Sequence, residues 1–189
     1  MATEARGPEA KISEASADLR FPIGKFKRPE TVSAEDRERF IAEIEAAPAN
    51  LRAAVEGLAD EKLNTPYRPG GWTVRQVIHH VPESHMNAYI RFKLALTENE
   101  PTIKTYEEDL WSKLPDVEKT PPEVSLGMLE LLHKRWAIVL RSITPEQWNR
   151  TFRHPELGLM RIDQNLALYA WHGKHHVAHV TALREREGW

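Results

Sequence analysis

The chain has 189 residues, which suffices for one hydrophobic core and is short for two ordinary domains. Its 26 Lys and Arg residues nearly balance 28 Asp and Glu residues, so the charge does not indicate a nucleic-acid partner or an anionic membrane surface. The lack of cysteine excludes disulfides, a thiolate nucleophile from the chain itself and cysteine-based zinc sites.

Residues 1–20 are small, charged and polar, which predicts a weakly ordered tail ahead of a single domain over residues 21–189. They lack the apolar segment of a secretory signal, and no apolar run in the chain reaches the roughly 18–20 residues that cross a bilayer. We therefore expect a cytoplasmic protein that acts on a small molecule, without a nucleic-acid or membrane partner.

The first half of the domain predicts two helices. Ser33 is a typical N-cap for a helix from 34 to about 60, whose apolar residues recur with a 3.6-residue period. Pro48 should kink this helix or divide it in two. Thr73 follows a loop rich in glycine and proline and caps a second helix that runs to about residue 97. Pro82 removes one backbone donor from that helix and should bend it.

The second half predicts two more helices. Residues 98–121 hold several prolines and no long periodic pattern, so they predict a long connection to a helix over 122–143. Residues 151–161 could form a small hairpin, after which Asp163 caps a helix over 163–187. The inward positions predicted for the third helix are Leu126, Leu129, Leu132, Trp136, Val139 and Leu140. Four long helices with long connections predict an all-α four-helix bundle.

The last helix carries a candidate metal-binding pair, His172 and His176. The two histidines are four residues apart, so they share one face of the helix, and both border its apolar stripe. Two imidazoles one turn apart can bind the same ion at about 2.1 Å, and Gly173 leaves room beside them. His175 and His179 have the same spacing but lie nearer the flank of the helix. The alternative is that these are solvated or hydrogen-bonded surface histidines.

A third ligand is needed, because a pair alone binds a metal weakly. The second helix offers three histidines. His85 lies closest to its apolar face, His80 lies on the margin of that face, and His79 points away. A helical-wheel projection assumes a straight helix, and Pro82 disturbs this one. Spacing alone therefore leaves His80 and His85 as equal candidates. His79 is predicted to face solvent or to support a ligand.

Three sequence blocks resemble the YfiT branch of the DinB superfamily, and the resemblance extends from about Phe21 to Trp189. The blocks are Phe21-Pro22-Ile23-Gly24, then Gly70-Gly71-Trp72-Thr73-Val74-Arg75-Gln76-Val77-Ile78-His79-His80 with Ser84-His85-Met86-Asn87 and Tyr89-Ile90-Arg91-Phe92-Lys93, and finally Tyr169-Ala170-Trp171-His172-Gly173-Lys174-His175-His176-Val177-Ala178-His179.

The resemblance implies a DinB-like homodimeric bundle with one divalent metal, zinc first and nickel second, in each subunit. Matched residue by residue, the implied ligands are His80, His172 and His176, which favours His80 over His85. One departure is Val81-Pro82-Glu83, where the family usually has Leu-Ala-Asp.

Three neutral ligands would leave a divalent ion its full charge and at least one open position, as in catalytic rather than structural zinc sites. Such a position can lower the pKa of water toward ~7, or it can hold the thiolate of a cosubstrate. The residues do not choose between these chemistries. The resemblance implies a metal-dependent hydrolase, and as an alternative an S-transferase that uses a low-molecular-weight thiol such as bacillithiol. A metal-stabilised binding module without catalysis is the third hypothesis.

No catalytic residue can be assigned from the sequence. Glu83, His85, Asn87 and Arg91 follow His80 and could reach the site, although each is expected on balance to be a solvated or structural group. Arg91 could bind a substrate carboxylate through two hydrogen bonds. No P-loop, dinucleotide fingerprint, nucleophile elbow or H-E-x-x-H motif is present.

Overall fold

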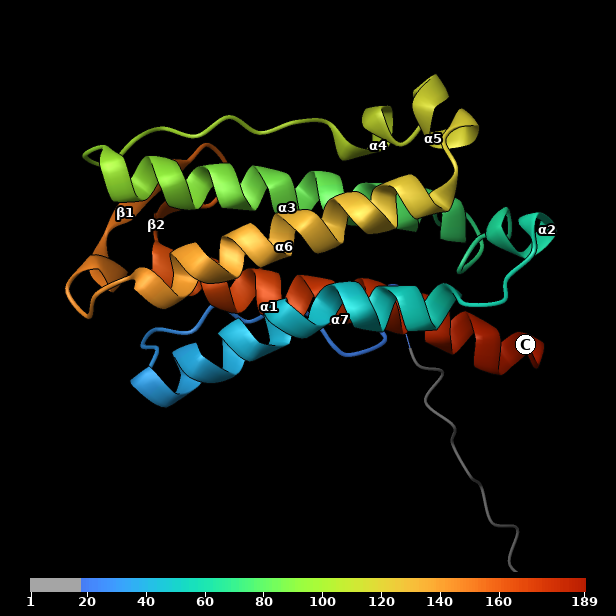
Figure 1. Ribbon diagram of the computed structural model, residues 1–189, viewed down its shortest axis with the longest axis horizontal. Helices are drawn as coiled ribbons and strands as arrows, with labels where there is room; N and C mark the ends of the chain where they lie inside the picture. The colour runs from blue at the N-terminus through green and yellow to red at the C-terminus, as the bar shows by residue number, and fades with distance from the viewer. Residues whose placement is uncertain (1–17) are drawn as a thin grey trace, which may run out of the picture.

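The computed structural model describes residues 18–189, so most of the tail predicted over residues 1–20 lies outside the described residues. Its main elements are four long helices, as predicted (Figure 1). The long helices are α1 (Ala34–Val55), α3 (Val74–Thr97), α6 (Pro122–Ser142) and α7 (Ile162–Glu187). The smaller elements are α2 (Asp60–Leu63), α4 (Glu108–Trp111), α5 (Pro115–Lys119), the 3₁₀ turn η1 (Gln147–Asn149), β1 (Thr151–His154) and β2 (Gly158–Arg161).

The four helices form a bundle in which α1 packs against α6 and α7, and α3 packs against the same two helices. Figure 1 shows that α3 and α6 run in one direction along the long axis, and that α1 and α7 run in the other. Because α3 and α6 are parallel, the chain must return along the whole bundle between them. Residues 98–121 make this return beside α3, and the later part of the return forms α4 and α5. The parallel pair therefore explains the length of the predicted connection.

The two N-terminal caps predicted from the sequence are present. The side chain of Ser33 accepts a hydrogen bond from the backbone N–H of Asp36, and Thr73 does the same for Gln76. The first helix ends at Val55 instead of about residue 60, because Gly57 adopts a positive φ of 74° and turns the chain toward α2. Helices α1 and α3 continue through their internal prolines, so Pro48 does not divide α1.

The predicted hairpin is present as β1 paired antiparallel to β2. The last helix begins at Ile162, one residue before the predicted start, and its N-cap is Arg161 rather than Asp163. Two hydrogen bonds explain the earlier start: the side chain of Gln164 accepts from the backbone N–H of Arg161, and the N–H of Ile162 donates to the carbonyl of Arg150. Asp163 instead forms an ion pair with Arg161.

The bundle core consists of two apolar clusters separated by a layer of histidines. One cluster surrounds Phe92 and Trp136, and the other surrounds Ile78 and Leu129. Between them along the helices lie His85, His133, His172 and His176. This polar layer positions the candidate site at mid-bundle.

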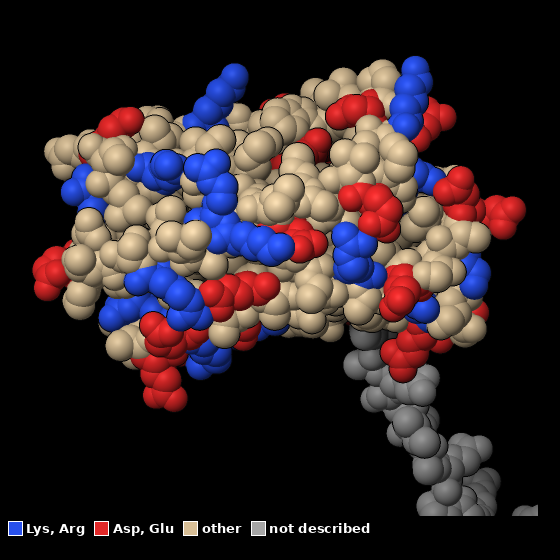
Figure 2. All heavy atoms as spheres, in the orientation of Figure 1, with Lys and Arg blue, Asp and Glu red and all other residues tan. Residues whose placement is uncertain are grey.

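The face in Figure 2 carries acidic and basic side chains of both signs interspersed among uncharged ones. Arg141 of α6 pairs with Glu38 and Glu45 of α1, and Arg52 of α1 pairs with Glu123 of α6. Pairs as exposed as these contribute little to stability. No helix among residues 18–189 combines the length and hydropathy that crossing a membrane requires.

Candidate metal centre

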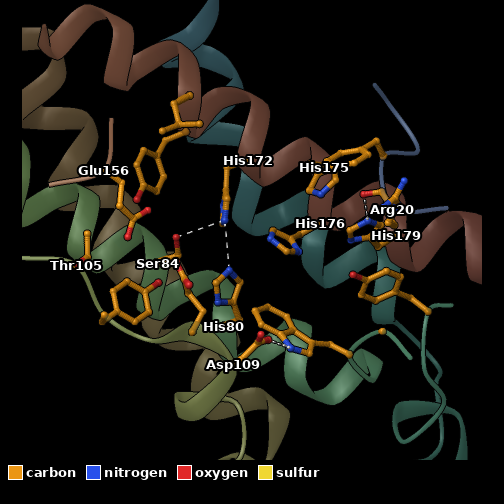
Figure 3. Close-up of a pocket in the computed structure, with 18 of the residues that line it drawn as sticks. Arg20, His80, Ser84, Thr105, Asp109, Glu156, His172, His175, His176 and His179 are labelled. Carbon is orange, nitrogen blue, oxygen red and sulfur yellow. Dashed lines mark hydrogen bonds between the residues drawn. The ribbon is translucent and has the colours of Figure 1, made fainter. Parts of the chain in front are cut away.

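Three histidine side chains from two helices face one another inside the bundle (Figure 3). His80 comes from α3, whereas His172 and His176 come from successive turns of α7. Each ring offers one nitrogen, and these three atoms lie within 4.8 Å of one another. The Nε2 atoms of His80 and His172 are 3.3 Å apart, close to the roughly 3.4 Å between two ligands held ~2.1 Å from one tetrahedral ion. The arrangement fits a single divalent ion.

Burial keeps these three rings in the protonation state that binds metals. Burial lowers the pKa of His80 to about 4, and it lowers the pKa of His172 and His176 well below the ordinary value. The rings are therefore neutral at pH 7, with lone pairs available for a metal. Neutral imidazoles suit zinc, nickel, copper or iron and do not suit magnesium or calcium.

The ring of His176 is buried, and its Nδ1 has no hydrogen-bond partner among residues 18–189, as is also the case for Nδ1 of His175 and of His179. The proline at position 82 does not remove His80 from the cluster, because α3 runs through it without a break.

His85, the other candidate that spacing alone had left open, lies behind the cluster. Its Nε2 is 3.1 Å from Nδ1 of His172, which is the nitrogen on the far side of that ring from His80. The structure thus groups His80 with the α7 pair and places His85 in contact with one member of it. Gly173 lies beside His85: a Cβ there would be in ordinary contact with Cε1 of His85, at 3.5 Å, and in a tighter contact with Cβ of Ala47, at 3.2 Å.

His133 is a buried residue of the histidine layer that the sequence prediction missed. Its Nε2 lies 2.8 Å from Nδ1 of His85, and its own Nδ1 lies 2.7 Å from the carbonyl oxygen of Ile44 in α1. Helical spacing could have indicated it, because His133 follows Leu129 by four residues and therefore lies on the same inward face of α6. Leu132, which was predicted to point inward, is only half-buried.

Three further histidines, His79, His175 and His179, are also buried. His79 does not face solvent, because its Nδ1 is 2.7 Å from the hydroxyl of Ser125 in α6. A helical-wheel projection that assumes a single buried face misplaces His79, because α3 is covered by α6 as well as by α7. His175 stacks on Trp171, and His179 stacks on Tyr67 with the ring centroids 3.9 Å apart.

The three rings open into a cavity of about 630 Å³. Its walls come from α3 and α7, from the start of α4 and the end of β1, and from irregular segments around residues 20–21, 67–72, 105–106 and 156–157. His175 and His179 line it as well, on the side where Arg20 lies (Figure 3). The volume is sufficient for a small organic molecule.

Three cavity residues next to the histidines were not singled out from the sequence. The indole of Trp72 packs on His80 with the ring centroids 4.5 Å apart, and its Nε1 donates to Asp109 over 2.9 Å. The hydroxyl of Ser84 lies 3.4 Å from Nε2 of His172. Asp109 belongs to the long return between α3 and α6, whose packing the sequence pattern did not reveal.

Among the polar residues that follow His80, Arg91 lines the cavity. Glu83 and Asn87 do not line it; the side chain of Asn87 donates instead to the backbone carbonyl of Glu83. Burial raises the pKa of the Glu83 carboxyl.

Comparison with known proteins identifies relatives over most of the chain. Residues 43–180 match the DinB superfamily. Proteins of Bacillus mycoides and Bacillus cereus, both provisionally named metal-dependent hydrolases, are 54% identical over 172 residues, which is 91% of this chain and 99% of each relative. A solved structure of YfiT from Bacillus subtilis superposes with a TM-score of 0.88 at 48% identity, covering 90% of this chain and 98% of YfiT. YfiT is described as a probable metal-dependent hydrolase with an unusual four-helix bundle topology.

Proposed function

The chain is a YfiT-like member of the DinB superfamily, and from this premise we propose that it is a hydrolase whose divalent ion is bound by His80, His172 and His176. The observation that carries the proposal is the convergence of three neutral ring nitrogens on one wall of a large cavity. Zinc is the first choice and nickel the second, because both accept imidazole ligands.

An ion with three protein ligands would keep a coordination position for water or a substrate oxygen and would lower the pKa of that water. The chain would supply the groups that orient the reactants. Asp109 is the proposed general base, since its charge acts on His80 and one of its oxygens is fixed by Trp72. Its second oxygen is then available to accept a proton from water.

A thiol-dependent transferase is the second candidate. The chain contains no cysteine, so a thiolate at the ion would have to come from a cosubstrate such as bacillithiol. A cavity of about 630 Å³ has room for a thiol and an electrophile together, which is the observation that favours this alternative.

We further propose that the protein is a homodimer that uses an exposed apolar stripe of α6. The stripe consists of Val124, Met128, Leu131 and Ile138, which share one face of the helix. Analytical ultracentrifugation of Leu131→Glu/Ile138→Glu tests it: the variant should be monomeric, and an unchanged dimer would exclude this face.

The activity test uses zinc-loaded protein, a panel of esters and amides, and chloro-dinitrobenzene with or without bacillithiol. Cleavage without thiol that disappears with chelator supports the hydrolase. Chelator-sensitive conjugation that requires thiol supports the transferase, and metal binding without either activity supports the non-catalytic module. His172→Ala should lose both metal and activity, whereas His154→Ala, on the hairpin, should retain the metal.

A further inference from the structure

Arg91 is a buried cation in the wall of the metal cavity. It follows His80 by eleven residues on α3, which is close to three full turns, so the two side chains leave the helix in nearly the same direction. Only 8% of Arg91 is exposed, and the residue lines the same cavity as the three histidines. A buried charge is stable only when other groups compensate it.

The partners of Arg91 do not provide that compensation. Its Nη1 donates to the phenol oxygen of Tyr169 over 3.3 Å, and no carboxylate among residues 18–189 lies within salt-bridge distance of it. A single neutral acceptor leaves most of the five guanidinium N–H donors without a protein acceptor.

Two tyrosines add further donors at the same place. Tyr106 and Tyr169 line the same cavity as Arg91. Burial raises the pKa of both phenols, while Ser84 and the charge of Arg91 act in the opposite direction. The phenol oxygen of Tyr106 is buried without a partner among the described residues. Tyr169 already accepts from Arg91, so its own proton can be donated. Arg91, Tyr106 and Tyr169 together thus offer more donors than acceptors to the cavity.

The position of Tyr169 relates this donor cluster to the metal ligands. Its ring lies 5.5 Å from the ring of His172, centroid to centroid, while its phenol oxygen contacts Arg91. The side chain of Tyr169 therefore spans the distance between His172 and Arg91. Glu108 and Glu156 also line the cavity, and their charge disfavours a dianion more strongly than a single carboxylate.

We propose that Arg91, Tyr106 and Tyr169 form a subsite for a carboxylate of the substrate. The proposal rests on the function proposed above and specifies its substrate class. The substrate is a small carboxylic acid whose reacting group is several bonds from the carboxylate, so that the reacting group reaches His172 while the carboxylate binds Arg91. A carboxylate has two oxygens that can accept from the guanidinium and from the phenols together.

Binding of benzoate, compared with its neutral analogue benzamide, tests the subsite by calorimetry and ligand-observed NMR. Metal-free protein is included so that binding to the ion is separated from binding to the subsite. We expect metal-free wild type to prefer benzoate at least tenfold, Arg91→Met to lose that preference, and Tyr106→Phe to weaken it several-fold. Arg135→Met, an exposed arginine of α6, is the matched control and should behave as wild type.

Equal binding of benzoate and benzamide by wild type, or an unchanged preference in Arg91→Met, would overturn the subsite. If Arg91→Met does not fold, Arg91→Lys replaces it; this variant keeps the charge but not the forked geometry and should show an intermediate preference. Preference for benzoate without any hydrolysis would preserve the subsite and reject the hydrolase. Hydrolysis of esters without preference for a carboxylate would do the reverse.

A second observation carries a separate inference. It is a series of hydrogen bonds, called the hydrogen-bond line below, that connects Ile44 to His172 through His133 and His85. It begins at Pro48, which has no backbone N–H and therefore leaves the carbonyl of Ile44, four residues earlier in α1, without its helical donor. That carbonyl lies 2.7 Å from Nδ1 of His133. Since a carbonyl can only accept, Nδ1 of His133 must carry the proton.

The remaining proton positions follow from this one. His133 is neutral at pH 7, because burial lowers its pKa to about 4, so its Nε2 is an acceptor for Nδ1–H of His85. Nε2 of His85 is then the acceptor for Nδ1–H of His172. The Nε2 lone pair of His172 is consequently directed toward His80. We infer that the carbonyl freed by Pro48 fixes the tautomer and orientation of His172 for metal binding.

Pro48→Ala separates this positioning role from an ordinary structural role. Alanine restores an N–H that competes for the Ile44 carbonyl, and it favours the helix more than proline does. We therefore expect the metal-free variant to be more stable while its zinc affinity, measured by chelator competition, falls about 10–100-fold. Stability and affinity rising together would contradict the inference.

Variants of His133 provide the second test. His133→Leu should weaken zinc binding by a similar factor, and His133→Gln should recover part of it because an amide can donate to Ile44 and accept from His85. His79→Gln, a buried histidine outside the line, is the control and should leave zinc affinity unchanged. ¹⁵N NMR should show the Nδ1–H tautomer for His85 and His172 in wild type. The Nε2–H tautomer at either residue, or unaltered zinc affinity in His133→Leu, would refute the inference that the hydrogen-bond line positions His172.

Discussion

Substitution of Gly173 measures how closely α1 and α7 approach beside the metal centre. A Cβ at this position would lie 3.2 Å from Cβ of Ala47 in α1 and 3.5 Å from Cε1 of His85. The first distance is shorter than an ordinary carbon–carbon contact, so the two helices must separate by a few tenths of an ångström. Overpacking of this kind costs about 1–3 kcal/mol. Alanine gains about 1 kcal/mol in helix propensity, so the net loss for Gly173→Ala should be about 1 kcal/mol.

Gly127 is the matched control, because it also lies within a long helix but a Cβ there meets nothing within 4 Å. Gly127→Ala should therefore show the propensity gain alone, about 1 kcal/mol. The two variants should differ by about 2 kcal/mol in the free energy of unfolding, which is roughly 4–8 °C in Tm for a chain of this size. Urea denaturation of the metal-free proteins provides the measurement. If Gly173→Ala were stabilised as much as Gly127→Ala, the close approach of α1 and α7 would be refuted.

Three further outcomes are expected. Chelator should lower the Tm of zinc-loaded wild type and leave the Tm of His172→Ala unchanged, as differential scanning fluorimetry will show; equal shifts in both proteins would exclude a role for this ligand. Burial lowers the pKa of His133 to about 4, below the ~6.5 of an unfolded histidine, so the unfolded state binds more protons between these values and the metal-free protein loses stability as the pH falls from 7 toward 4. Urea titrations at pH 7.5 and 5 test this, and a flat profile would contradict it. Arg52→Ala removes an exposed ion pair with Glu123 and should change the free energy of unfolding by less than about 1 kcal/mol, so a larger loss in urea would mean that the pair is shielded from solvent.

Local chemistry explains which parts of the fold were predictable. The helices and the caps at Ser33 and Thr73 depend on residues a few positions apart, and the structure confirms them. The start of the last helix was wrong by one residue because Gln164, rather than Asp163, makes the capping contact. Helix periodicity and capping are local signals, whereas the parallel arrangement of α3 and α6 is set by how the whole chain packs.

The candidate site shows the same division. The pairing of His172 and His176 follows from a spacing of four residues, and the structure places both beside His80; that they bind a metal stays a prediction. Spacing did not separate His80 from His85, since both face inward and contact opposite nitrogens of the same ring. His133 reaches the site only through contacts between helices that are distant in sequence.

The cavity combines two kinds of backbone with different tolerance to change. All three histidines of the candidate centre lie on long helices, whereas much of the surrounding wall is irregular chain, around residues 67–72, 105–106 and 156–157. Loops accept insertions and substitutions more readily than the helices they connect. Descendants of such a protein can therefore diverge in what they admit to the cavity while inheriting the same histidines unaltered, and closely similar bundles can come to serve unrelated substrates.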